Sequence, residues 1–195
     1  EHLTWEKSYT MADRLISILP AKHKNLPKLR LDVARNPGSF SGKFQSKVKE
    51  YPEEEYFQYL YAKLLLDNDE ETKASNILLK VNPKRHFEQW WKLKNIAVRN
   101  ALKVQDFKRA YDLTKNHNLP YGADLAEAEW LAGWISLRYL KDATASCAHF
   151  QTLFDNTKLA SSKSKASYWL GRCHESAGDS ENALKWYTTS SQYRG

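Results

Sequence analysis

The sequence predicts an all-α fold, an α-solenoid or superhelix of tetratricopeptide-like helical hairpins. The first observation behind this prediction is a repeat towards the C-terminal end. Gly133, within Trp-Leu-Ala-Gly-Trp, is followed 38 residues later by Gly171, within Tyr-Trp-Leu-Gly-Arg, and His-Phe at 149–150 is followed 37 residues later by Trp-Tyr at 186–187. A fixed period of this length is typical of stacked helix pairs, in which each repeat buries its apolar face against the next.

The second observation is the distribution of glycine and proline. The 195 residues include seven glycines, and none lies between Gly42 and Gly122. That interval is rich in Lys, Leu, Ala and Glu, which favour helix. Four prolines stand where one apolar periodicity gives way to another: Pro20, Pro52, Pro83 and Pro120. Because proline interrupts a helix, these positions are expected to separate helices.

The third observation is a regular series of aspartates. Four of them, at spacings of 37, 36 and 37, precede the expected second helix of a pair: Asp69, Asp106, Asp142 and Asp179. Asp is favoured at a helix N-cap because its carboxylate accepts first-turn N–H groups, which stabilises the helix by ~1 kcal/mol per cap. A small residue follows four or five positions later, where paired helices approach closely: Ala74, Ala110, Ser146 and Ala183. We therefore expect four N-caps in one register.

The N-terminal segment, residues 1–51, is expected to hold less regular helices. A first helix over 5–19 is predicted by apolar residues at spacings of three and four: Ala12, Leu15, Ile16 and Leu19. A short helix is expected around 29–34, and the Asn-Pro-Gly-Ser sequence at 36–39 predicts a loop. A second short helix is expected over 44–51.

The remaining segment, 52–195, is predicted to be the superhelical part. Its helical-hairpin repeats are expected at about 52–82, 83–118, 122–157 and 160–193. The two helices of the first repeat are marked by apolar stripes at Phe57, Leu60, Tyr61 and Leu64, and at Ala74, Ile77, Leu78 and Val81. Those of the second repeat are marked by Phe87, Trp90, Trp91, Lys94 and Val98, and by Phe107, Ala110 and Tyr111.

The net charge, the lengths of the apolar runs and the first residues limit the classes of protein to which the chain can belong. The formal net charge is +7 and the pI is near 9.2, with lysines spread along the chain. Two interpretations stay open, a solvated lysine-rich surface and attraction to a polyanion. No apolar run reaches the eighteen or so residues of a membrane helix, so no transmembrane segment is expected. The first five residues lack both an initiator Met and a leader pattern, so we expect a processed or excised chain.

The two cysteines have two interpretations. Cys147 and Cys173 do not form a metal-ligand pattern and fall on neighbouring helices of the predicted repeats. They form a disulfide in an oxidising compartment, or they are two small buried core residues. The second interpretation is favoured, and the first stays open.

The tryptophans also have two interpretations, a sugar-binding surface and a core. Five of the seven share stripes with Ala and Leu: Trp90, Trp130, Trp134, Trp169 and Trp186. In a solenoid those stripes form the core between helices, where loss of a Trp side chain costs ~3–5 kcal/mol. The core interpretation is therefore favoured.

No residue pattern predicts a catalytic, cofactor or metal site. The six histidines never pair at i, i+4, and His174-Glu175 lacks the second His of a zinc protease motif. The sequence has no Gly-rich phosphate loop and no Gly-x-Ser-x-Gly motif. Basic and aromatic residues alternate at 84–87 and 91–94, but the aromatic residues follow the helix period and are expected to point inward. Nucleic-acid binding is therefore not expected.

Several segments of the C-terminal half together resemble a known family. They are WLAGWISLRYL (130–140), His149-Phe150, YWLGRCHESAGD (168–179) and WYTTSSQY (186–193). These segments are similar to the last repeats of the superhelical domain of soluble lytic murein transglycosylases. Trp90-Trp91, the Arg-Asn-Ala-Leu sequence at 99–102 and the Ala-Tyr-Asp-Leu sequence at 110–113 resemble the preceding repeat. The resemblance covers about residues 88–193.

This resemblance implies a scaffold rather than an enzyme. In that family the superhelical domain precedes a lysozyme-like domain, which cleaves the β-1,4 bond between N-acetylmuramic acid and N-acetylglucosamine to a 1,6-anhydro product in the bacterial periplasm. The implied role is to position peptidoglycan glycan strands for that catalytic domain of the same parent chain, with other cell-wall proteins as further partners. The catalytic domain is expected to be absent here, so the chain by itself is expected to be inactive and to need no cofactor.

One short match to the family's catalytic motif is set aside. The family's catalytic carboxylate lies in a Glu-Ser motif, and Glu175-Ser176 has the same two residues. Glu175 lies four residues after Gly171 and so corresponds to Leu137 of the earlier repeat, which is not acidic. We therefore expect no catalytic role for Glu175. The alternative function for the chain is a tetratricopeptide-like protein–protein interaction module with no cell-wall role.

Overall fold

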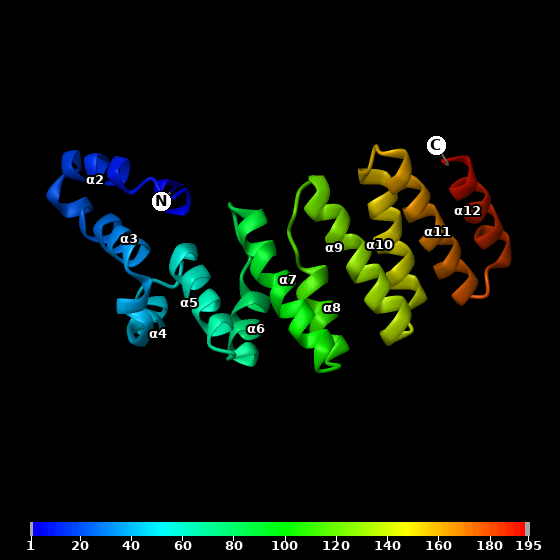
Figure 1. Cartoon of the computed structure of the whole chain (residues 1–195), viewed down its shortest axis with the longest axis horizontal. Helices are drawn as coiled ribbons and strands as arrows, with labels where there is room; N and C mark the ends of the chain where they lie inside the picture. Colours follow the sequence, from blue (N-terminus) through cyan, green and yellow to red (C-terminus); the bar gives the residue numbers. More distant parts are fainter. Residues whose placement is uncertain (1, 194–195) are drawn as a thin grey trace. The chain divides into compact units, whose positions relative to one another are not determined.

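The computed structural model describes residues 2–193 and is all-α, as the sequence predicts (Figure 1). Within this range the chain forms twelve α-helices and no β-strand. None of the described helices is long and apolar enough to cross a membrane. The chain divides into two compact units, residues 1–77 and 78–195. The division at residues 51 and 52, and the superhelical curvature, stay predictions.

The first unit contains five helices and most of a sixth. They are α1 (His2–Trp5), α2 (Tyr9–Ile18), α3 (Asn25–Arg35), α4 (Phe44–Glu50), α5 (Glu55–Asp67) and α6 (Glu71–Lys80), whose last three residues belong to the second unit. Short 3-10 helices lie at Ala21–His23 and Pro37–Lys43. The second of these occupies most of the loop predicted at 36–39, where the Ser39 N–H donates to the Asn36 carbonyl at 3.1 Å. A 3-10 helix needs only such i→i+3 bonds and so fits a short segment.

The apolar stripes predicted for the first unit are only partly buried. Ala12 and Ile16 pack with Leu31 of α3, but Leu15 is 50% exposed. In α5 the predicted stripe contributes Phe57 alone to the fully buried set. The buried face of α5 is wider than the stripe and also includes Tyr56, Ala62, Leu65 and Leu66.

The second unit consists of three successive helical hairpins, which are numbered second, third and fourth because the first predicted repeat is 52–82. The hairpins pair α7 (Phe87–Lys103) with α8 (Phe107–Lys115), α9 (Gly122–Ile135) with α10 (Ala143–Asn156), and α11 (Ala160–Ser176) with α12 (Ser180–Gln192). Each helix contacts the next one along the chain, and Figure 1 shows α9, α10, α11 and α12 side by side. Each helix therefore buries its apolar face against its neighbours in the sequence, as tetratricopeptide-like repeats do.

Three of the four predicted N-caps are confirmed. The side chains of Asp106, Asp142 and Asp179 accept hydrogen bonds from the N–H groups three residues later, at 3.1, 2.9 and 3.1 Å. The fourth prediction, Asp69, is wrong by one residue. Asp69 has a φ of 59°, and Glu70 is the residue that immediately precedes α6.

The physical reason for this error is a left-handed residue in each turn. The same φ region occurs immediately before the three confirmed caps, at Gln105, Lys141 and Gly178, with φ of 62°, 56° and 77°. Asp69 corresponds to these residues, so the cap position in this turn is Glu70. The cap spacings then become 36, 36 and 37. Each predicted small residue falls four positions after its cap, and all four are buried: Ala74, Ala110, Ser146 and Ala183.

The third hairpin contains one extra residue. Nine positions separate Gly133 from the cap Asp142, but eight separate Gly171 from the cap Asp179. The helix that continues α9 widens into a π-helical segment, η3 (Ser136–Leu140), before the turn. A π-bulge accommodates one inserted residue without breaking the helix. The insertion explains why the glycines repeat at 38 residues and the caps at 37.

Candidate binding site

The tryptophans of the second unit pack in the core, and two of them also face a groove. Trp90 is fully buried, which confirms the core interpretation for this residue. Four others are partly buried against one cluster, formed by Phe150, Leu153, Ala166, Leu170 and Cys173: Trp130, Trp134, Trp169 and Trp186. The aromatic rings also contact one another, with Trp130 and Trp169 edge to face at a centroid distance of 6.1 Å.

An open groove of about 440 Å³ lies between the first helices of the third and fourth hairpins. We call it the α9–α11 groove. Its lining residues are Trp134, Leu137, Arg138, Lys141, Trp169, Arg172 and Ser176. The first four come from α9, η3 and the turn that follows, and the last three come from α11. Among the residues that the structure describes, the lining of the groove therefore combines apolar and cationic side chains and includes no carboxylate.

The π-helical segment shapes one wall of the groove. Leu137 and Arg138 belong to η3, and Lys141 follows it in the left-handed conformation. The Ser136 hydroxyl stabilises the widened turn because it donates to the carbonyls of Ala132 and Gly133, at 2.9 and 3.0 Å. The inserted residue alters the register of this wall relative to the corresponding helix of the fourth hairpin. Such segments occur frequently at functional sites.

The cationic residues of the groove differ in their partners. The guanidinium of Arg172 lies 3.1 Å from a carboxylate oxygen of Glu175 and 3.5 Å from the Tyr168 hydroxyl. The side chains of Arg138 and Lys141 are exposed and make no ion pair or hydrogen bond within residues 2–193. These two residues therefore provide the uncompensated positive charge of the groove.

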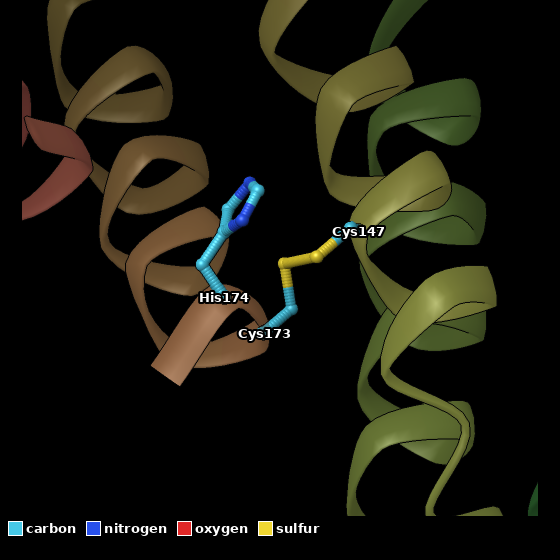
Figure 2. Close-up of side chains that lie close together, drawn as sticks. All are labelled: Cys147, Cys173 and His174. Atoms are coloured by element: carbon cyan, nitrogen blue, oxygen red, sulfur yellow. A yellow bond between two sulfur atoms is a disulfide. The ribbon is translucent and has the colours of Figure 1, made fainter. Parts of the chain in front are cut away.

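A disulfide joins the two hairpins behind the groove. Cys147 of α10 and Cys173 of α11 are bonded, with their α-carbons 5.4 Å apart (Figure 2). The interpretation of two reduced core cysteines is therefore wrong, although Cys173 is fully buried. Cys173 immediately follows Arg172 in α11, so the crosslink holds that wall of the groove against α10.

His174 lies beside the disulfide (Figure 2). With Cys147 and Cys173 it forms a group of three residues whose side chains are of types that can bind a metal ion. The sulfur atoms of the group are bonded to each other, so they are not thiolates, the form of Cys that binds metal. Nδ1 of His174 lies 3.1 Å from a carboxylate oxygen of Asp179. His174 thereby links the end of α11 to the cap of α12.

A buried carboxylate with two histidines is the polar centre of the second unit. Glu129 of α9 lies with one oxygen 3.0 Å from Nε2 of His117 and the other 2.6 Å from Nδ1 of His149. The Tyr111 hydroxyl lies 3.1 Å from Nε2 of His149, and the Leu119 N–H donates to Nδ1 of His117 at 2.9 Å. The cluster therefore connects α8, the following loop, α9 and α10.

These contacts determine the protonation of Glu129. Burial alone disfavours its charged form, but the hydrogen bonds and the electrostatic interactions with His117 and His149 outweigh this effect and lower the pKa of Glu129 to about 2. Nδ1 of His117 accepts a hydrogen bond from a backbone N–H, so its Nε2 must carry the proton that is donated to Glu129. Both oxygens of Glu129 are thus used inside the protein, which suits a structural role.

Lys94 is a second buried charge in this unit. The sequence places it on the apolar stripe of α7, and the structure buries it completely, with Nζ donating to the backbone carbonyl of Asn116. Burial lowers the pKa of Lys94 to about 8, because the charged form loses its hydration. Lys94 thereby connects α7 to the C-terminal end of α8.

Glu175 has partners that match a structural role. Its carboxylate accepts a hydrogen bond from the Tyr187 hydroxyl at 2.9 Å and pairs with Arg172. The side chain is exposed, and both contacts are made to residues of the same hairpin. That Glu175 has no catalytic role stays a prediction.

The groove and the Glu129 cluster are missed by the sequence analysis. A signal for Glu129 is present, because it lies on one helical face with Leu125, Ala132 and Gly133, where a solvated carboxylate is not expected. The groove leaves a weaker signal. Its two walls belong to different hairpins, and only the packing of α9 against α11 brings them together.

Comparisons with known proteins assign no family to the chain. No protein-family model and no curated protein matches the sequence. One crystal structure of MamA is similar to the chain with a TM-score of 0.46 and 12% identity, covering 90% of this chain and 95% of that one. A second MamA crystal structure gives a TM-score of 0.47 and 14% identity, covering 83% of this chain and 86% of that one. Similarity at this level carries no information on activity.

Proposed function

We propose that the chain is a non-catalytic helical-repeat module that binds another protein. The observation that supports this proposal most directly is the α9–α11 groove, which is open, aromatic and cationic and lies between consecutive hairpins. The disulfide and the Glu129 cluster hold the helices around it. Rigid helices that present such a groove lower the entropic cost of binding.

The polar clusters of the second unit support a role without catalysis. Glu129 is buried with both oxygens occupied by histidines, so no oxygen is left to accept a proton from a substrate. The exposed Glu175 is paired with Arg172 and Tyr187. Each of these carboxylates has a packing or pairing role that explains its position.

The test is reconstitution with a purified partner. Proteins captured by the immobilised chain would be purified and titrated against it by calorimetry, and the melting temperature would be followed in parallel. We expect a saturable complex with one protein and a rise in melting temperature. Release of soluble glycan fragments by the chain acting alone would contradict a non-catalytic role.

A second candidate function is the superhelical scaffold of a periplasmic lytic transglycosylase. The disulfide favours it, because disulfides persist in oxidising compartments such as the bacterial periplasm. Most of the segments that resemble this family lie in α9 to α12, the hairpins that carry the groove, and the others lie in α7 and α8. In this role the chain positions peptidoglycan strands for a separate catalytic domain, and its positive charge attracts the carboxylates of the peptide stems.

Sedimentation with purified sacculi separates the two candidates. The scaffold function predicts that the chain pellets with sacculi at low salt and is released at high salt, and that glycan fragments raise its melting temperature. The protein-binding function predicts a complex with a purified protein and no effect of glycan fragments.

A further inference from the structure

We propose that the α9–α11 groove binds an acidic peptide segment that also carries apolar side chains. This inference rests on the proposed protein-binding function and names the chemistry of the partner. The relevant surface is the lining already defined, in which Trp134, Trp169 and Leu137 provide the apolar part and Arg138, Lys141 and Arg172 the charged part.

The hydrogen-bonding groups of the lining favour an anionic ligand. Arg and Lys side chains donate hydrogen bonds and accept none, and the indole N–H of Trp is also only a donor. Of the seven lining side chains, only Ser176 offers a hydrogen-bond acceptor. Neutral sugars present hydroxyl groups, which need acceptors as well as donors. Carboxylates only accept, so they match a surface of donors.

The nearby carboxylates have other partners, so the positive charges of Arg138 and Lys141 are available to a ligand. Glu175 pairs with Arg172 and so compensates that residue. Asp142, which follows Lys141, directs a carboxylate oxygen to the Ala145 N–H as the cap of α10. The side chains of Arg138 and Lys141 have no partner within residues 2–193. A bound carboxylate therefore gains two charge-assisted contacts without breaking an existing ion pair.

The size and composition of the groove favour a peptide over a nucleic acid. Two unpaired cations, three residues apart in the sequence, suit one or two carboxylates rather than a long run of phosphates. The indole faces and Leu137 offer apolar surface beside them, which suits apolar side chains on the same side of the peptide as the acidic ones. An extended segment presents alternate side chains to opposite sides, so an acidic and an apolar residue two positions apart can enter the groove together.

The experiment uses the full chain and two blocked eight-residue synthetic peptides. One consists of two Glu-Ser-Leu-Ser repeats, so that Glu and Leu lie on the same side of the extended peptide, and the other has Gln in place of each Glu. Binding is followed by tryptophan fluorescence and calorimetry. We expect the Glu peptide to bind at least about tenfold more tightly than the Gln peptide, since charge-assisted bonds are about twice as strong as neutral ones. Its affinity is also expected to fall with rising salt.

A double variant assigns the binding to the groove. Arg138→Gln with Lys141→Asn removes both unpaired charges, and Asn tolerates the left-handed conformation at position 141. We expect a loss of affinity for the Glu peptide of about tenfold or more, with the melting temperature unchanged. The matched control is Lys92→Gln with Lys158→Gln, which removes the same charge from exposed residues outside the groove and is expected to retain affinity.

Three outcomes would overturn the assignment. They are equal loss in the control variant, no binding of the Glu peptide, and tighter binding of a neutral chitin oligosaccharide or a single-stranded oligonucleotide that requires Arg138 and Lys141. A purified protein partner that binds the intact chain and the double variant equally would also overturn it, while leaving the proposed protein-binding function in place.

Discussion

The aromatic ring of Phe150 lies directly against the α-carbon of Gly133. A β-carbon added at Gly133 would be 2.7 Å from Cε1 of Phe150, which is closer than real contacts allow. The fourth hairpin repeats the arrangement, with Tyr187 against Gly171. In each of these two hairpins, a glycine of the first helix thus leaves space for an aromatic ring of the second. This relationship explains physically why both the glycines and the aromatic pairs recur in the sequence.

Substitution of this glycine tests the close approach. Gly133→Ala removes a helix-disfavouring residue, which by itself stabilises a helix by up to ~1 kcal/mol. The ring of Phe150 must nevertheless move, and overpacking of this kind costs ~1–3 kcal/mol. We expect the free energy of unfolding, measured by urea denaturation, to decrease.

Gly38→Ala is the matched control, because a β-carbon at Gly38 meets nothing within 4 Å. We expect this variant to be as stable as the wild type or slightly more stable. Equal effects of the two substitutions would show that Phe150 adapts without cost.

The same glycines show how far local sequence predicts this fold. Caps, glycines and small residues act within one hairpin, so their spacing reveals the helix pairs and their order. Asp69 illustrates the limit, because the cap and the left-handed residue before it differ by one position and both accept Asp. Only the geometry of the turn decides between them.

The candidate site depends on contacts between residues far apart in the sequence, which spacing does not encode. Glu129 meets His117 and His149 from 12 and 20 residues away, and no local pattern joins them. Cys147 and Cys173 leave both oxidation states open in the sequence, and the packing of α10 against α11 brings them within bonding distance. The groove likewise exists only after α9 and α11 are placed together.

The corrected cap register makes opposite predictions for two aspartates. Asp142→Ala removes an N-cap hydrogen bond to Ala145 and should cost ~1 kcal/mol. Asp69→Gly replaces a residue at positive φ with one that adopts this conformation freely, so we expect equal or greater stability. Urea denaturation of both variants provides the test. If Asp69→Gly were as destabilising as Asp142→Ala, Asp69 would be a cap after all.

The disulfide is expected to stabilise the second unit. Cys147 and Cys173 are 26 residues apart, and closing a loop of this length stabilises a fold by ~3 kcal/mol relative to the open chain. The double variant Cys147→Ala with Cys173→Ala should therefore unfold at a lower urea concentration. Adding a thiol reductant should lower the stability of the wild type and leave that of the variant unchanged. A wild type insensitive to complete reduction would contradict this expectation.

Lys94 should make the protein more stable at alkaline pH. Burial lowers its pKa to about 8 in the folded chain, and the unfolded value is about 10.4. Between these values the unfolded chain binds more protons than the folded one, so the free energy of unfolding rises with pH, by up to ~1.4 kcal/mol per pH unit. Lys94→Met should lack this contribution. The difference between the two proteins, measured by urea denaturation from about pH 8 to about pH 10.5, isolates it.

Glu129 should have the opposite effect at acid pH. Despite its burial, the contacts from His117 and His149 hold its pKa at about 2, below the value of about 4.3 for an unfolded Glu. The stabilisation is complete above the unfolded value and is lost as the pH falls from there through about 2, because the unfolded chain then binds more protons. We expect the free energy of unfolding to decrease over this window in the wild type and in the exposed control Glu181→Gln, and to decrease less in Glu129→Gln. Parallel acid profiles for all three proteins would mean that the two histidines do not stabilise the Glu129 carboxylate.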